Sequence, residues 1–281
     1  MTKAIATKKK KPKSFPRQSR FAIEAELHAQ GFSRVAGIDE AGRGPLAGPV
    51  CAAVVVFEPG ARINKVNDSK LLDPELREEL YAKIVERAVG YGVGLACAEE
   101  IDTINILRAT KLAVRRALRN MKMLPDHLLL DALHLENCTI PQKAFVKGDS
   151  RCFSIAAASI IAKVTRDRIM TNYASEYPGY GFEQHKGYAV PEHKAALRDL
   201  GPCTLHRKTF LEQWFGTDKL RNSNTFVNFR HQLDGCMHCE PVHGLLDTLT
   251  ALQASLPKCE WTELHQSAHT RLALLNSALH S

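Results

Sequence analysis

Residues 35–45 place two adjacent carboxylates at the end of an apolar run: Val35-Ala36-Gly37-Ile38-Asp39-Glu40-Ala41-Gly42-Arg43-Gly44-Pro45. Ionised acids beside a hydrophobic core must be paired, hydrogen-bonded or bound to a metal ion. The glycines that follow let backbone N–H groups approach a ligand closely, and the arginine between them can bind a phosphate. The alternative interpretation is a strand that ends in a glycine turn with two solvated acids.

Alternating strand-like and helix-like segments across residues 21–220 indicate an α/β fold. Strands are predicted at 34–38, 49–57, 91–98, 128–130 and 143–146. Helices are predicted at 21–30, from Asp73-Pro74 onward, at 101–121 and at 153–177. The first two strands flank the glycine-rich turn, so we expect them to pair as an antiparallel hairpin.

The two longest predicted helices carry apolar residues spaced to form one buried face each. In the first helix these are Ile104, Leu107, Leu112, Ala113 and Leu118, and in the second they are Ile155, Ala158, Ala162, Ile169 and Tyr173. Arg166 falls on the second stripe by its angular position. We expect an ion pair with a neighbouring acid to account for a charge at that place.

The net charge of +8 comes from the N-terminal tail. Residues 1–20 carry eight of the 38 basic residues and no acid, so the rest of the chain carries 30 basic and 30 acidic residues. The tail can attract phosphates nonspecifically, or it can be a disordered solubilising segment. We divide the chain into a disordered basic tail (1–20), a main domain (21–220) and a mainly helical C-terminal extension of unknown role (221–281).

The composition predicts a cytoplasmic protein with no membrane segment. No apolar run approaches the roughly 18 residues that a spanning helix needs. The basic N-terminus lacks the apolar core and cleavage site of a secretory signal. Five cysteines are scattered singly beside apolar or small residues, which predicts reduced thiols; they are Cys51, Cys97, Cys138, Cys152 and Cys203.

Asp131 and Asp149 share the feature that makes Asp39 unusual, because each lies at or just past the end of a short predicted strand. Sites gather at strand ends in an α/β sheet, so these carboxylates are expected to converge with Glu40. Four clustered acids cannot all ionise without cations between them. Oxygen ligands select Mg²⁺ or Mn²⁺, and two such ions about 4 Å apart would support phosphoryl chemistry. Asp126 is a competitor for the position of Asp131.

Residues 37–50 resemble the signature of ribonuclease HII, the bacterial type 2 ribonuclease H. Further segments similar to this family follow in the expected order over roughly residues 32–215. They are Asp68-Ser69-Lys70, Ile101-Asp102 with Asn105-Ile106-Leu107, Lys147-Gly148-Asp149-Ser150, residues 154–167, Tyr180-Gly181-Phe182, His185-Lys186-Gly187-Tyr188, and His206-Arg207 with Phe210.

The resemblance implies a ribonuclease H-like mixed sheet flanked by helices. It implies an enzyme that hydrolyses the RNA strand of RNA–DNA hybrids and nicks 5′ to ribonucleotides embedded in duplex DNA, leaving 5′-phosphomonoesters. Two-metal-ion hydrolysis with Mn²⁺ or Mg²⁺ is implied, together with roles in ribonucleotide removal, DNA repair and RNA primer processing. The expected partners are these nucleic acids, and the protein is expected to be a monomer.

The resemblance also assigns residues to the site. The catalytic, metal-binding acids that it implies are Asp39, Glu40, Asp131 and Asp149. The turn that senses the ribose 2′-hydroxyl corresponds to Gly42, Arg43 and Gly44. Many family members have glycine after the third acid, whereas Ala132 stands at that position here.

Residues outside the acid motifs are expected to contact the substrate or to support the loops. Tyr188 matches the family's tyrosine that packs on the sugar just past the RNA-to-DNA junction. Lys70 is a candidate phosphate contact, with a solvated surface lysine as the alternative. For His185 and His206 we expect packing or loop structure rather than acid–base catalysis, because metal-activated water needs no histidine.

Two rival functions remain open. Ribonuclease HIII shares the chemistry, but its acid-pair motif lacks the Gly-Arg-Gly turn, and residues 1–30 are too short for its N-terminal substrate domain. A noncatalytic nucleic-acid-binding protein on the same fold would gain nothing from acids facing phosphates. In the extension a Zn²⁺ site is conceivable, although the spacing fits no standard finger; its candidates are Cys236, His238, Cys239, His243, Cys259, His265 and His269.

Overall fold

The computed structural model describes residues 20–215, 232–233, 239–251, 253 and 258–279. The chain forms two compact units, each assembled from separate segments. The first unit consists of Met1–Glu40, Ala52–Gly94 and Val114–Val164, and the second of Ala41–Cys51, Leu95–Ala113 and Thr165–Ser281. The predicted boundary near residue 220 lies outside the described residues and stays a prediction.

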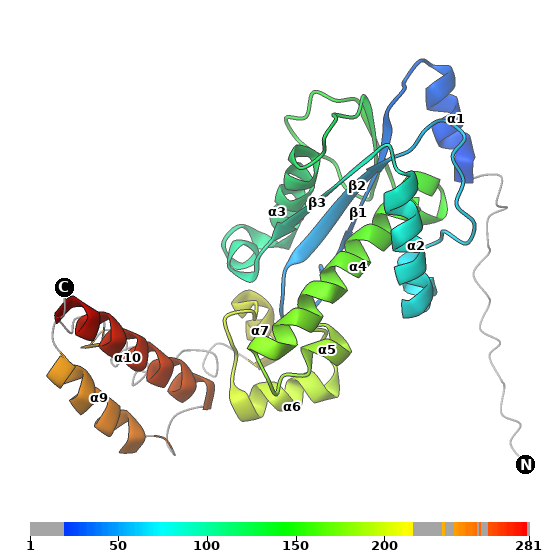
Figure 1. The fold of residues 1–281 in the computed structure, drawn as a ribbon. Helices are drawn as coiled ribbons and strands as arrows, with labels where there is room; N and C mark the ends of the chain where they lie inside the picture. Colours follow the sequence, from blue (N-terminus) through cyan, green and yellow to red (C-terminus); the bar gives the residue numbers. More distant parts are fainter. Residues whose placement is uncertain (1–19, 216–231, 234–238, 252, 254–257, 280–281) are drawn as a thin grey trace, which may run out of the picture. The chain divides into compact units, whose positions relative to one another are not determined.

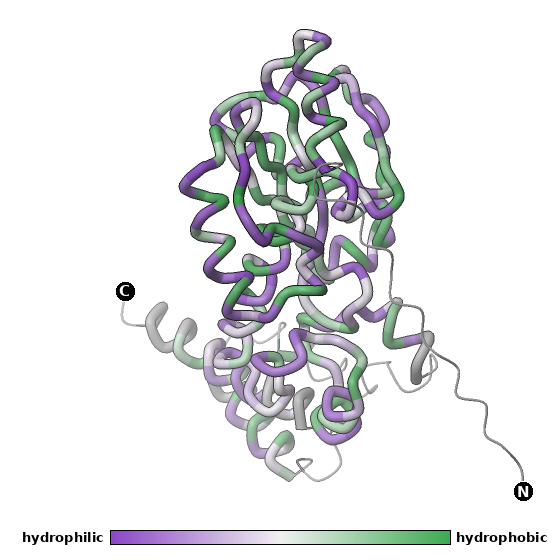
Figure 2. Tube along the Cα trace, turned by 90° about the vertical axis from the view of Figure 1, so that its right-hand side faces the viewer, coloured by the Kyte–Doolittle hydropathy of each residue, from purple (hydrophilic) through white to green (hydrophobic). Residues whose placement is uncertain are grey.

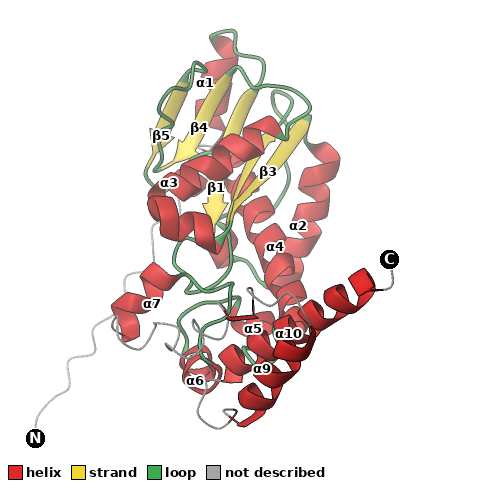
Figure 3. Ribbon diagram, turned by 90° about the vertical axis from the view of Figure 1, so that its left-hand side faces the viewer, coloured by secondary structure: helices red, strands yellow, loops and turns green. Residues whose placement is uncertain are grey.

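A five-stranded mixed sheet is the frame of the fold (Figures 1 and 3). Its strands are β1 (Val35–Ala41), β2 (Val50–Val56), β3 (Gly90–Ala96), β4 (His127–Asp131) and β5 (Gln142–Phe145). Their spatial order is β3-β2-β1-β4-β5, and the β1–β4 and β4–β5 pairs are parallel. The predicted α/β class and all five predicted strands are confirmed, and β1 and β2 are neighbours as expected.

Helices pack closely on the sheet at glycine positions. α3 (Ala98–Arg119) and α4 (Phe153–Glu176) lie on opposite faces (Figures 1 and 3). A Cβ atom on Gly37 of β1 would lie 2.0 Å from the backbone carbon of Ser154 in α4, and one on Gly92 of β3 would lie 2.1 Å from the carbonyl oxygen of Ala117 in α3. These strands can therefore carry no side chain at the two contact points.

The first half of α4 is buried on all sides, because every residue from Phe153 to Ala162 is buried. The predicted stripe residues of this half, Ile155, Ala158 and Ala162, are buried as expected, and the residues between them are buried as well. Its outer side is covered by α1 (Ala22–Ala29), whose Glu24 accepts hydrogen bonds from Ser154, and by the short helix η2 (Ser69–Leu71), where the N–H of Ser69 donates to the Ser159 hydroxyl.

The predicted stripe of α3 is interrupted by a kink. Asn105 has φ 66° and ψ 163°, which is not a helical conformation. The rotation that this residue introduces shifts the helical phase, and Leu107, which we expected to be buried, is 45% exposed. Beyond the kink the prediction holds, since Ala113 and Leu118 are buried.

The remaining helices complete the two units. They are α2 (Pro74–Arg87), α5 (Phe182–His185), α6 (Pro191–Leu200), α7 (Lys208–Phe215), α9 (Cys239–Ala251) and α10 (Lys258–Leu279). Helix α9 packs on α10 through apolar side chains such as Leu249 and Leu264, so the described part of the extension is helical. Hydrophilic and hydrophobic stretches alternate along the outer helices (Figure 2). No described helix is both long and apolar enough to cross a membrane.

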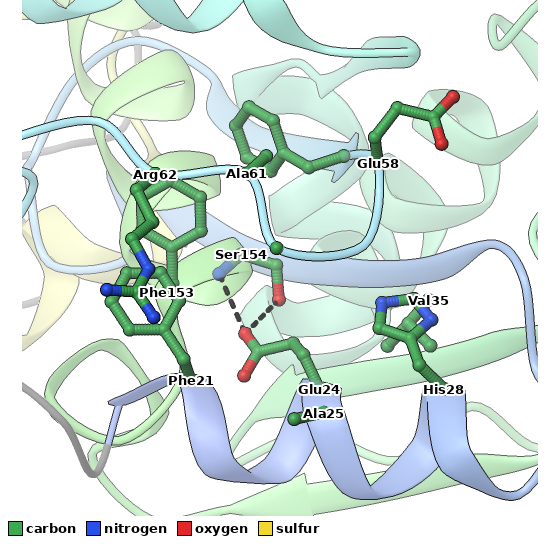
Figure 4. A pocket seen from close by; sticks show the side chains of 12 residues that line it. Phe21, Glu24, Ala25, His28, Val35, Glu58, Ala61, Arg62, Phe153 and Ser154 are labelled. Carbon is green, nitrogen blue, oxygen red and sulfur yellow. Dashed lines mark hydrogen bonds between the residues drawn. The ribbon is translucent and has the colours of Figure 1, made fainter.

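A small cavity of about 120 Å³ lies beside α1 and the start of α4 (Figure 4). Phe21, Phe57 and Phe153 are among the residues that line it. Glu24 accepts hydrogen bonds from the N–H of Ser154 at 3.0 Å and from its hydroxyl at 2.9 Å, so its carboxylate holds the first turn of α4. Burial raises the pKa of Glu24. None of the predicted site acids lines this cavity.

Candidate active site

The predicted acids meet at the carboxyl ends of the central strands of the first unit. Asp39 is near the end of β1, and Asp131 is the last residue of β4. The strand register pairs Ile38 with Leu130, which places Asp39 level with Asp131. Asp149 follows β5 in the short helix η3 (Gly148–Ser150), and the N–H of Gly148 donates to Asp131 Oδ1 at 2.7 Å. This hydrogen bond ties η3 to the end of β4.

Burial and the charges of neighbouring acids raise the pKa values of two carboxyl groups in this cluster. Asp39 is 7% exposed, and burial raises its pKa well above the ordinary value, followed by the charges of Glu40 and Asp131. Burial and the charges of Asp68 and Asp131 raise the pKa of Asp149 to about 6. Both shifts have the same origin, since carboxylates crowded in a poorly hydrated place resist ionisation. The arrangement therefore favours an external cation.

Lys70 and Asp68 belong to the same electrostatic neighbourhood. Burial lowers the pKa of Lys70, but the charges of Asp68, Asp39, Asp149 and Asp131 outweigh burial, and the net shift is upward. Asp68 Oδ1 accepts the N–H of Lys70 at 3.0 Å. Sequence reasoning missed Asp68 as a contributor to this site, although it stands in the same family segment as Lys70.

The turn after Asp131 explains why glycine suits the following position. Ala132 has φ 44°, in the left-handed region, where a side chain costs about 1–2 kcal/mol. Its N–H donates to the carbonyl oxygen of Phe145 at 2.8 Å, so the turn is held against the end of β5. Ala132 thus adopts a glycine-like conformation, and the departure from the family pattern leaves Asp131 at the strand end.

Asp126 does not lie with the other acids. It precedes β4, whereas Asp131 ends this strand. Its carboxylate accepts the N–H groups of Ser33 and Arg34, at 2.9 Å each. Asp126 therefore fastens the loop before β1, at the opposite end of β4 from Asp131.

The zinc candidates are only partly described. Cys236 and His238 lie outside the described residues. Within the described part of the chain, no group of three or more His, Cys, Asp or Glu side chains is placed so that it could hold a metal ion, and this applies to the four predicted acids as well. The five single cysteines named above are free thiols, and burial raises the pKa of Cys51 to about 12.

The glycine-rich turn belongs to the second unit, where a buried arginine holds its backbone. Arg207 is 0% exposed. Its guanidinium donates to the carbonyl oxygens of Gly42 at 2.6 Å, Arg43 at 2.9 Å and Gly48 at 2.8 and 3.0 Å. Sequence reasoning placed Arg207 only inside a family segment and gave it no role.

Arg166 holds the other side of the same turn. It donates to the carbonyl oxygens of Ala47 at 3.0 Å, Pro49 at 2.9 Å and Lys186 at 3.0 Å. The predicted ion pair is wrong, because its hydrogen-bond partners are carbonyl groups rather than a carboxylate. The three carbonyls belong to two loops, so only the folded chain could assemble them.

The two glycines of the turn have different surroundings. Gly42 is buried with φ 91°, and a Cβ atom there would lie 2.0 Å from Arg166 Nε. Gly44 is exposed, and nothing lies within 4 Å of its missing Cβ. Gly42 is therefore required by packing inside the protein, while Gly44 borders open space and Arg43 is exposed.

Tyr188 stands at the surface of the second unit, 39% exposed. The Arg166 guanidinium lies 5.7 Å from the centre of its ring, within the range of a cation–π contact.

His206 is buried, and burial lowers its pKa to about 3, with His193 as the next cause. A group that stays neutral at physiological pH and is enclosed in this way serves packing, as predicted for His206.

Comparison with known proteins identifies the family. The family model for ribonuclease HII matches residues 36–213. The chain belongs to the ribonuclease HII family. The ribonuclease HII of Syntrophotalea carbinolica is 53% identical over 188 residues, which cover 67% of this chain and 90% of that protein. The ribonuclease HII of Geotalea uraniireducens is 52% identical over 194 residues, covering 69% and 90% respectively.

Solved structures agree with this assignment. The crystal structure of ribonuclease H2 from Pyrococcus horikoshii superimposes with a TM-score of 0.53 at 30% identity, covering 66% of this chain and 96% of that one. The chain is therefore a ribonuclease H enzyme with the ribonuclease H-like fold. The family match ends at residue 213, so α9 and α10 lie beyond it.

Proposed function

We propose that this ribonuclease HII family member hydrolyses the RNA strand of RNA–DNA hybrids and nicks duplex DNA on the 5′ side of embedded ribonucleotides. The products carry 5′-phosphomonoesters. The enzyme acts as a cytoplasmic monomer in ribonucleotide removal, DNA repair and RNA primer processing. The observation that carries the proposal is the convergence of acids from β1, β4 and η3, at the positions where the resemblance implies catalytic acids.

Asp39, Glu40, Asp131 and Asp149 are proposed to hold divalent cations. Their oxygen donors suit Mg²⁺ or Mn²⁺, and the raised pKa values of Asp39 and Asp149 support the proposal, because a nearby cation would stabilise their ionised forms. Two bound ions would supply an activated water and stabilise the leaving oxygen. The chain's own contribution is to fix the carboxylates on strand ends, where the hydrogen bond from Gly148 to Asp131 limits their movement.

Recognition of the ribonucleotide is assigned to the glycine-rich turn. Gly44 and Arg43 are exposed, while the carbonyl oxygen of Arg43 accepts a hydrogen bond from Arg207. The exposed side of the turn can therefore face a substrate, whereas Gly42 is buried. A ribose 2′-hydroxyl, which can donate and accept, is the one local feature that distinguishes RNA from DNA.

Tyr188 is proposed to read the next sugar. A flat ring accommodates a deoxyribose but collides with an additional 2′-hydroxyl, so discrimination comes from exclusion. The Arg166 cation beneath the ring supports this orientation. Lys70, near the acids, is proposed to contact a backbone phosphate adjacent to the metal ions.

Cleavage of duplex DNA that contains one ribonucleotide tests the proposal. We expect nicking 5′ to the ribonucleotide with Mg²⁺ or Mn²⁺, and no cleavage of an all-DNA duplex. No cleavage with any divalent cation would refute it. Asp131→Asn should abolish nicking with the fold intact, whereas Asp126→Asn, at the other end of β4, should remain active while folded.

A further inference from the structure

Three histidines gather behind Tyr188 in the second unit. His185 ends α5, His193 lies in α6, and His206 precedes α7 (Figure 1). His193 is 0% exposed and His206 is 3% exposed. The rings of His185 and His193 stack with centroids 4.4 Å apart, and the Nε2 atoms of His193 and His206 are 3.0 Å apart.

The hydrogen bonds decide which nitrogen carries each proton. The N–H of Cys203 donates to Nδ1 of His206 at 3.0 Å, so a neutral His206 carries its proton on Nε2. Nε2 of His206 therefore donates to Nε2 of His193. His193 in turn carries its proton on Nδ1, which lies 2.9 Å from the carbonyl oxygen of Tyr188. A single donor chain runs from Cys203 through two imidazoles to Tyr188.

Both imidazoles of the chain are neutral at physiological pH. Burial lowers the pKa of His193 to about 4 and that of His206 to about 3. An additional proton on His193 Nε2 would face the N–H of His206, and one on His206 Nδ1 would face the N–H of Cys203. The hydrogen bonds of this chain therefore all point the same way, and its imidazoles keep one protonation state. Such an arrangement fixes the position of the loop and does not transfer protons.

The backbone beneath Tyr188 is held at three consecutive carbonyl groups. Lys186 O accepts from Arg166 at 3.0 Å, Gly187 O accepts from the N–H of Leu46 at 2.8 Å, and Tyr188 O accepts from His193. The N–H of Val190 also donates to Tyr188 O, at 2.9 Å. Gly187 has φ 82°, and a Cβ atom there would lie 2.6 Å from Ala47 O. This loop has little freedom to shift.

We propose that His193, oriented by His206, is a positioning residue that fixes Tyr188 for discrimination at the RNA-to-DNA junction. The inference rests on the proposed role of Tyr188. Exclusion of one hydroxyl group requires the ring to be placed within a fraction of an ångström, and displacements of about 1 Å can cost about 100-fold in such sites. The imidazole supplies this precision by holding the carbonyl of the same residue whose ring contacts the sugar.

Two substitutions of His193 separate its two hydrogen bonds. In His193→Asn the amide nitrogen takes the place of Nδ1 and can still donate to Tyr188 O, but the bond to His206 is lost. In His193→Gln the amide lies where Nε2 was, so the bond to His206 can form but the donor to Tyr188 is lost. Each variant loses one hydrogen bond of the same chain, so the two are matched controls for stability.

The readout is junction preference, the ratio of kcat/KM on duplex DNA with one ribonucleotide to kcat/KM on a continuous RNA–DNA hybrid. We expect His193→Gln to lower this ratio by about tenfold, towards that of Tyr188→Ala, and His193→Asn to keep the wild-type ratio. Equal ratios in the two variants would overturn the inference. Absence of any preference in the wild type would instead overturn the proposed role of Tyr188.

A measurement on the wild type covers the case in which the variants do not fold. Nitrogen-15 NMR of the imidazoles should show His206 protonated at Nε2 and His193 protonated at Nδ1 at neutral pH. The opposite tautomer at His193 would overturn the inference, because Nδ1 could not then donate to Tyr188.

Discussion

Both units of this enzyme bury charged side chains, but the partners of those charges differ. In the first unit burial and the charges of neighbouring acids raise the pKa values of Asp39 and Asp149. In the second unit Arg166 and Arg207 together donate seven hydrogen bonds to carbonyl oxygens. Burial still lowers the pKa of Arg207, but its guanidinium donates four hydrogen bonds to carbonyl oxygens.

The difference shows what each region is built to do. Acids that repel one another store an unfavourable interaction that a cation from solution can relieve, so they form a binding site. Cations that donate to several backbone carbonyls from two or more segments hold those segments together, so they organise loops. Buried charges thus form a binding site in the first unit and hold loops in place in the second.

The largest effect is expected at Asp39. Asp39→Asn should reduce kcat/KM by about 1,000-fold, or ~4 kcal/mol, because a cation ligand is lost. The folded-state pKa of Asp39 is above its unfolded value, so its contribution to stability is lost as pH rises above the unfolded pKa. The metal-free variant should therefore be at least as stable as the wild type at neutral pH.

Thermal unfolding with and without Mn²⁺ measures how Asp39→Asn changes stability and the response to the cation. Mn²⁺ should raise the melting temperature of the wild type more than that of Asp39→Asn. If the two proteins gained equally, Asp39 would not be part of the cation site, and the contrast between the two units would lose its first half.

The second effect tests the organising role of Arg207. Arg207→Met retains much of the volume but leaves the carbonyls of Gly42, Arg43 and Gly48 without their donor. We expect a loss of about 3 kcal/mol in the free energy of unfolding, measured with urea. Arg207→Lys should lose less, since an ammonium group can still donate but cannot reproduce the planar fork. A Met variant as stable as the wild type would mean that these hydrogen bonds only offset desolvation of the guanidinium.

A smaller effect separates the two glycines of the turn. Gly42→Ala should cost about 2 kcal/mol, because the residue has φ 91° and its new Cβ would collide with Arg166. Gly44→Ala should leave stability unchanged, since its surroundings are open. Chemical denaturation of both variants measures the difference. Equal losses would show that the position of Arg166 does not determine the requirement for glycine.

The smallest effect concerns acid stability. The pKa values of His193 and His206 are lowered from 6.5 to about 4 and about 3 in the folded state. The unfolded chain therefore binds protons first as pH falls below 6.5, and stability is lost in that range. Between about pH 7 and about pH 5.5, His193→Asn should lose ~1 kcal/mol less than the wild type. Identical slopes in urea titrations would show that His193 is not held neutral.

Local signals were sufficient for the strands and for the acids. The apolar runs before Asp39 and Asp131 predicted strands that end on carboxylates, and parallel pairing of β1 with β4 brings these two ends together. The buried faces of helices were predicted less well. The kink at Asn105 exposed Leu107, and contacts from α1 and η2 buried the whole first half of α4.

The sequence by itself determined the family, the positions of the strands along the chain, and the acids at the strand ends. Each of these depends on residues that are neighbours in the sequence. Tertiary structure alone decided which charges are satisfied. Arg207 meets Gly42 across 165 positions, and Arg166 meets Pro49 across 117. The hydrogen-bond chain from His206 through His193 to Tyr188 likewise depends on how α6 packs against the segments before and after it. Hydrogen bonds between distant residues leave no periodic pattern in a sequence, so only the folded chain reveals them.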